Sequence, residues 1–125
     1  ILLKYQVKAI IVSNTTEGNR ENLQNTSKHQ KGGLSGKPLE LKSNQLINKF
    51  YNLLKNKIDI IGVGGVDSGE SAYNKFLAGA NYIQLYTGMV FQGPNIVVKI
   101  KKELKKLLTH DGVKNFKEIV GKNNN

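Results

Sequence analysis

Apolar and polar residues alternate along this chain in blocks whose lengths suit strands and helices in turn. Three short apolar runs are rich in β-branched residues, and each ends in polar residues or glycine, which is typical of buried strands. These runs lie at residues 7–12, 58–63 and 82–86. Longer stretches with apolar residues at helical spacing alternate with them, so the pattern predicts three strand–helix units in a row.

Three amphipathic helices are expected after these strands. Ser43 can cap the first, which runs to about residue 56, while Ser68 can cap the second, for which Gly79 is a suitable stop. The third covers roughly residues 95–108, and its lysines fall mainly between apolar positions, which favours a solvated helix face over a nucleic-acid surface. The positions expected inside are Ile96, Val97, Ile100, Leu104, Leu107 and Leu108.

The order of strands and helices implies parallel strands joined by helical crossovers. Three such strands alone leave two unpaired edges, and a complete (β/α)8 barrel needs about 250 residues against the 125 present. We therefore predict an α/β fold in which residues 1–125 form an incomplete domain: the C-terminal portion of a TIM (β/α)8 barrel, with about three βα units. The apolar start at Ile1 predicts an interior point of a longer protein, with the N-terminal strands absent from this chain.

Composition narrows the possible functions. The net charge is +10, but almost every basic residue is lysine and Arg20 is the single arginine, so we favour compositional bias over polyanion binding. A basic barrel fragment that binds RNA or serves as a scaffold stays open as an alternative. The absence of cysteine excludes disulfides and thiolate sites, and His29 and His110 lack partners at metal spacing, so no metal is expected. The chain contains no apolar run of about 20 residues that could span a membrane.

Two glycine-rich segments follow the second and third strands. Gly62-Val63-Gly64-Gly65 ends one strand, and Tyr86-Thr87-Gly88 ends the next. Glycine lets backbone N–H groups approach a phosphate closely, and barrels of this kind bind phosphate in the loops after their last two strands. A short helix at 89–91 would complete such a site. The two segments predict one shared phosphate site, which another phosphate-binding barrel enzyme could also possess.

Further polar residues follow the first strand. Asn14 offers one acceptor and two donors that could read a planar amide or carboxylate, but Asn14 and Thr15 could equally cap a turn. Residues 17–31 form a long polar stretch that we interpret as a variable surface loop. The glycines at 32–36 are interpreted as ordered contacts to a ring or phosphate, with a flexible hinge as the alternative.

Three side chains near the glycine segments have simpler interpretations. Asp67 and Glu70 are expected to be charges at a helix N-terminus rather than catalytic acids. Tyr86 could stack near a cofactor, although a tyrosine at a strand end more often serves in packing.

Taken together, these segments resemble class 2, quinone-dependent dihydroorotate dehydrogenase, in matching order and approximate spacing over nearly the whole chain. They are Ile-Val-Ser-Asn-Thr-Thr at 11–16, Gly-Gly-Leu-Ser-Gly-Lys-Pro-Leu at 32–39, Ile-Ile-Gly-Val-Gly-Gly-Val at 60–66, Ala-Gly-Ala at 78–80, Gln-Leu-Tyr-Thr-Gly at 84–88 and Phe-Gln-Gly-Pro at 91–94. The resemblance implies an enzyme of pyrimidine biosynthesis that oxidises dihydroorotate to orotate, with FMN taking the hydride and a quinone reoxidising the flavin.

The resemblance also implies roles for individual residues. It implies FMN contacts at Ser13, Gly36, Gly65, Tyr86 and Thr87, with Gly64 and Gly88 helping to hold the phosphate. It matches Asn14 and Thr15 to the pair that binds the substrate's carboxylate and ring amides.

Other parts of the family's machinery are expected upstream of this chain. The serine base, the lysine near the flavin, and the N-terminal helices that meet the membrane and quinone have no counterpart here, so we expect no catalytic residue in this chain. Neither Ser13 nor Ser35 is assigned as the base. Membrane association, at the inner mitochondrial membrane of a eukaryote or the cytoplasmic membrane of a bacterium, would come only through that missing region. The isolated chain is expected to be poorly soluble and inactive.

Overall fold

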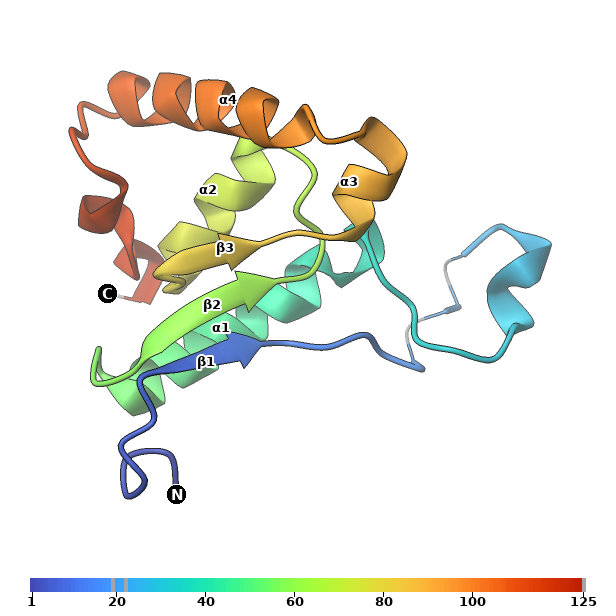
Figure 1. Ribbon diagram of the computed structural model, residues 1–125, viewed down its shortest axis with the longest axis horizontal. Helices are drawn as coiled ribbons and strands as arrows, with labels where there is room; N and C mark the ends of the chain where they lie inside the picture. Colours follow the sequence, from blue (N-terminus) through green and yellow to red (C-terminus); the bar gives the residue numbers. More distant parts are fainter. Residues whose placement is uncertain (19, 22, 125) are drawn as a thin grey trace.

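The computed structural model describes residues 1–18, 20–21 and 23–124 (Figure 1). Asn19 and Asn22, which belong to the predicted 17–31 loop, lie outside the described residues. The strands are β1 (Ala9–Val12), β2 (Asp59–Val63) and β3 (Tyr82–Gln84). The helices are α1 (Glu40–Leu54), α2 (Gly69–Ala78), α3 (Thr87–Gln92) and α4 (Ile96–His110). Short 3-10 turns lie at Thr26–His29, Lys37–Leu39, Phe116–Ile119 and Lys122–Asn124.

The three strands form one parallel sheet in the order β1-β2-β3. Val12 lies opposite Gly62, and Val63 lies opposite Gln84, so the strands end at one edge of the sheet. The predicted parallel strands with helical crossovers are therefore confirmed. All three strands are shorter than predicted. β1 begins only at Ala9, after a turn in which the Val7 N–H donates to the Leu2 carbonyl, β2 begins one residue late at Asp59, and β3 ends at Gln84.

Helices α1 and α2 cover one face of the sheet, behind the strands in Figure 1. The core beneath them contains Val12, Ile47, Leu54, Ile58, Ile60, Ala78 and Ala80. A second cluster joins α2 to α4 through Val66, Ala72, Ile96 and Ile100. Strand side chains alternate between faces, and the opposite face leaves Ile11 58% exposed. This uncovered apolar face fits a sheet that forms part of an α/β barrel.

Two of the three predicted helix signals are confirmed. Ser68 caps α2 in a capping box with Ser71, and Gly79 ends it with a φ of 117°. The predicted cap at Ser43 is wrong, because the 3-10 turn Lys37–Leu39 leads directly into α1 and makes Leu39 the N-cap. Ser43 instead lies one turn inside the helix, where it is buried and its Oγ donates to the Val63 carbonyl at 2.5 Å.

The expected inner face of α4 is largely confirmed. Ile96 and Ile100 are buried against α2. Val97 is 41% exposed, contrary to prediction, because it lies about 100° around the helix from Ile96 and leaves the stripe that faces α2. Among the described residues, no helix is both long and apolar enough to cross a bilayer.

Candidate functional site

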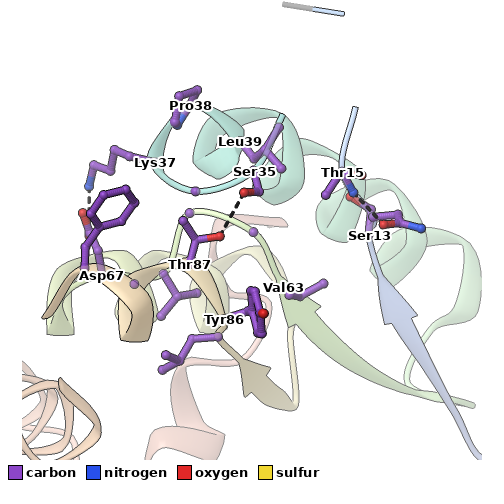
Figure 2. Close-up of a pocket in the computed structure, with 18 of the residues that line it drawn as sticks. Ser13, Thr15, Ser35, Lys37, Pro38, Leu39, Val63, Asp67, Tyr86 and Thr87 are labelled. Atoms are coloured by element: carbon purple, nitrogen blue, oxygen red, sulfur yellow. Dashed lines mark hydrogen bonds and ion pairs between the residues drawn. The ribbon is translucent and has the colours of Figure 1, made fainter. Parts of the chain in front are cut away.

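A cleft of about 620 Å³ lies at the carboxyl ends of the strands (Figure 2). All nine residues to which the sequence assigned a binding role line it. They are Ser13, Asn14, Thr15, Gly36, Gly64, Gly65, Tyr86, Thr87 and Gly88. The predicted convergence of the two glycine segments on one site is therefore observed, and Asn14 and Thr15 share that site. The roles of the individual residues stay predictions.

The loop after β2 forms one wall of the cleft. Gly64 and Gly65 have φ values of 105° and 77°, a left-handed conformation that side chains rarely adopt. A Cβ at Gly65 would lie 2.5 Å from the Cα of Glu40, so glycine is required where this loop packs on the start of α1. The close approach thus has a packing reason, and both glycines also line the cleft.

The loop after β3 forms a second wall. The short helix expected around 89–91 is confirmed as α3, which already begins at Thr87. The Oγ1 of Thr87 donates to the Oγ of Ser35 at 3.0 Å, as Figure 2 shows. A Cβ at Gly88 would meet the Val66 carbonyl oxygen at 2.5 Å, so the β2 and β3 loops touch each other through this glycine.

The 32–39 segment closes the cleft from above the strands. Leu34 and Thr16 form an antiparallel bridge with two backbone hydrogen bonds, of 2.7 and 3.2 Å. The bridge anchors the segment, which agrees with an ordered loop and not with a free hinge. Gly36 has a φ of 80°, and a Cβ there would lie 3.0 Å from the Thr87 side chain. Ser35 and Gly36 are thereby held against the start of α3.

Asn14 and Thr15 follow β1 at the far end of the cleft. The backbone N–H of Thr15 donates to the Asn14 Oδ1 at 2.8 Å, so the turn-capping interpretation is realised in the structure. Both residues are exposed and line the cleft, which leaves them accessible to a ligand. The two interpretations of this pair are therefore compatible.

Charged residues at the cleft rim were not identified from the sequence as a pair. The Nζ of Lys37 lies 2.8 Å from the Glu40 carboxylate and 3.2 Å from that of Asp67. The hydrogen bond to Glu40, assisted by that to Asp67, raises the pKa of Lys37 above its usual value. Lys37 and Asp67 are thirty residues apart, and no local pattern could have linked them. Glu70 lies in the first turn of α2, as expected.

Aromatic side chains lie at the open side of the cleft. Tyr86 is 79% exposed and Phe91 is 83% exposed, so neither packs substantially within this chain. The packing interpretation of Tyr86 is thus not favoured. Phe91 was assigned no role from its sequence position, and Gln92 beside it donates to the Asp67 carbonyl at 3.0 Å.

This site lies in a chain whose residues 1–108 match the family model described as dihydroorotate dehydrogenase. The chain belongs to the dihydroorotate dehydrogenase family. A relative from Deinococcus radiodurans, named dihydroorotate dehydrogenase (quinone), is 44% identical over 112 residues, which are 90% of this chain and 30% of the relative. The mitochondrial quinone enzyme of Arabidopsis thaliana is 43% identical over 97% of this chain and 26% of its own length.

Solved structures of the family show the same fold. A ligand-free dihydroorotate dehydrogenase from Eimeria tenella superposes with a TM-score of 0.94 and 34% identity, over 99% of this chain and 34% of that chain. The same enzyme in complex with ferulenol gives a TM-score of 0.93 with 35% identity, over 97% of this chain and 32% of that chain. The chain thus spans about a third of the length of these relatives.

The backbone of this cleft fits a phosphate group such as that of a flavin. Among the described residues, the backbone amides of Gly65, Thr87 and Gly88 have no hydrogen-bond partner in the protein. Such N–H groups at neighbouring loops are suited to phosphate oxygens. Lys37 is already paired with two carboxylates, and the Thr87 hydroxyl donates its proton to Ser35, so these backbone amides are donors that remain available on this side of the cleft.

Proposed function

We propose that this chain is the C-terminal part of a quinone-linked dihydroorotate dehydrogenase and supplies its FMN phosphate site and part of its substrate site. One observation carries the proposal: the nine residues matched to flavin and substrate contacts come from separate loops and line a single cleft. Family membership favours this function over a scaffold or RNA-binding role and over an unrelated phosphate-binding barrel.

Within this proposal, the backbone amides of Gly65, Thr87 and Gly88 hold the phosphate, with Gly64 shaping the loop and the Thr87 hydroxyl tying the site to Ser35. Ser13, Gly36 and Tyr86 contact the rest of the flavin, in keeping with the family resemblance. Bound there, FMN would supply the redox chemistry, as the acceptor of a hydride from dihydroorotate and the donor of electrons to a quinone.

The substrate side of the cleft is assigned to Asn14 and Thr15. Their amide and hydroxyl groups can bind the carboxylate and ring amides of dihydroorotate. Lys37 and Asp67 neutralise each other at the opposite rim, which disfavours either as the base. The base is proposed to come from the remaining barrel segments, together with the quinone site and any membrane association. The relatives from Arabidopsis thaliana and Mus musculus are named mitochondrial.

The proposal is tested with a chimera in which this chain replaces the matching segment of the Deinococcus radiodurans relative. We expect the purified chimera to carry FMN and to form orotate from dihydroorotate with a quinone as acceptor. The unmodified relative is the positive control, and this chain alone is expected to show no turnover.

Two results would contradict the proposal. A chimera that folds, as judged by circular dichroism, but binds no FMN would remove the flavin assignment. A chimera that binds FMN but not orotate would remove the substrate assignment. Salt-sensitive RNA binding by the chain, in the absence of flavin binding, would support the basic-module alternative instead.

A further inference from the structure

A fully buried lysine lies directly behind the cleft. Lys75, in the second half of α2, has 0% of its surface exposed. Its Nζ donates to the Oγ of Ser43 at 3.1 Å and to the Oδ1 of Asn44 at 2.9 Å, both on α1. Among the described residues it forms no ion pair with a carboxylate. A buried ammonium without a carboxylate partner is rare and costly, so its presence here needs a physical reason.

The lysine reaches the cleft through one hydroxyl group. The Oγ of Ser43 donates its single proton to the Val63 carbonyl at 2.5 Å and accepts from Lys75 with a lone pair. Val63 is the last residue of β2, and it lines the cleft immediately before Gly64. The hydrogen bonds therefore run in one direction, from the buried ammonium through the hydroxyl to the end of the strand.

This end of the strand determines how the glycine loop begins. The carbonyl of Val63 and the N–H of Gly64 belong to one planar peptide unit, so fixing the carbonyl also fixes the direction of the N–H. Ser43 packs on the same loop, since a Cβ built at Gly64 would lie 3.4 Å from the Ser43 Cβ.

The neighbouring backbone also makes room for the lysine. A Cβ built at Gly62 would lie 3.1 Å from the Cδ of Lys75 and 3.0 Å from the Cβ of Ala80. Glycine at this strand position thus lets the lysine stem pass under β2. Burial lowers the pKa of Lys75 to about 8, so the side chain still carries its proton at neutral pH and can donate to Ser43.

We propose that Lys75 and Ser43 are positioning residues that hold the end of β2, and with it the Gly64–Gly65 loop, in the conformation that binds the flavin phosphate. This inference rests on the proposed function, because it assumes that the loop holds that phosphate. Lys75 acts through Ser43 and touches neither cofactor nor substrate.

The chain offers a matched pair of substitutions for the test. Ser43→Ala and Asn44→Ala each remove one hydrogen-bond partner of Lys75, but only Ser43 is bonded to Val63. Each variant of the chimera is titrated with FMN and with riboflavin, which lacks the phosphate. A role confined to folding would weaken both flavins alike, whereas positioning of the phosphate loop would weaken FMN selectively.

We expect Ser43→Ala to weaken FMN binding about tenfold, equivalent to about 1.4 kcal/mol, with riboflavin affinity unchanged. Asn44→Ala is expected to leave both affinities unchanged, and Lys75→Met to follow Ser43→Ala. If Lys75→Met does not fold, the comparison of Ser43→Ala with Asn44→Ala still decides the matter. Equal losses for both flavins, or no loss in Ser43→Ala, would overturn the positioning role.

The test separates this inference from the proposed function. If the unmodified chimera binds FMN no more tightly than riboflavin, the phosphate site itself is wrong. If the unmodified chimera binds FMN more tightly than riboflavin, and Ser43→Ala keeps the same ratio of affinities, the phosphate site is supported and only the positioning role of Ser43 and Lys75 is wrong.

Discussion

The buried charge of Lys75 makes stability depend on pH in a defined window. Burial lowers the pKa of this lysine from its ordinary value near 10.5 to about 8, against a smaller opposing attraction from Glu40. Below pH 8 the lysine is protonated in the folded and unfolded states, and the folded state carries the full cost of the buried charge. Between pH 8 and 10.5 only the unfolded state retains the proton, so stability rises with pH.

The size of this effect follows from the shift. A difference of about 2.5 pKa units corresponds to about 3 kcal/mol, of which about 2 kcal/mol develops between pH 7.5 and pH 10. Lys75→Met removes the titrating group while keeping a side chain of similar length. The unfolding free energy of the unmodified chimera should therefore rise relative to that of Lys75→Met by about 2 kcal/mol over this range.

Urea unfolding followed by circular dichroism, at several pH values between about 7.5 and 10, measures this difference. All other titrating groups are common to the two proteins, so their contributions cancel to first order. A difference in unfolding free energy that does not change with pH, or that changes in favour of Lys75→Met as pH rises, would show that Lys75 is not held in a buried, charged state at neutral pH.

Further predictions concern the cleft. Gly65→Ala should destabilise the chimera by about 3 kcal/mol, because φ at this residue is 77° and the new Cβ would meet the backbone of α1. Gly93→Ala is the control: φ is 75°, but a Cβ there has no atom within 4 Å, so the cost should be only about 1 kcal/mol. Urea unfolding measures both losses of stability. Thr87→Val removes the hydrogen bond to Ser35 and should lower the affinity for FMN about tenfold in a fluorescence titration. An unchanged affinity would argue against a role of the Thr87 hydroxyl in the flavin site. Asn14→Ala should weaken orotate binding about tenfold without changing the affinity for FMN. Calorimetric titration with each ligand in turn measures the two affinities separately.

The order of elements and the location of the site were predictable because both follow from local patterns. Strand runs, the Ser68 cap and the Gly79 stop each lie within a few residues, and parallel strands bring their carboxyl ends to one edge. That geometry explains how glycine segments far apart in sequence could be assigned to one site from the residue pattern alone.

The errors and omissions concern interactions that local patterns do not encode. A capping preference is local, but the start of α1 is set by the preceding 3-10 turn, so Ser43 was given the wrong role. The Lys37–Asp67 pair spans thirty residues, and the burial of Lys75 depends on α1, α2 and a glycine in β2 meeting at one point. In sequence, this lysine looks like any other lysine of a basic chain.

The proposed function depends on the two glycine loops of this cleft holding the phosphate of a flavin. Parallel fluorescence titrations of the chimera with FMN and riboflavin measure the contribution of that phosphate, because the two ligands differ only in this group. The proposed site requires FMN to bind at least about tenfold more tightly, since charge-assisted hydrogen bonds from the loop amides are lost with riboflavin. Equal affinities for the two flavins would contradict it.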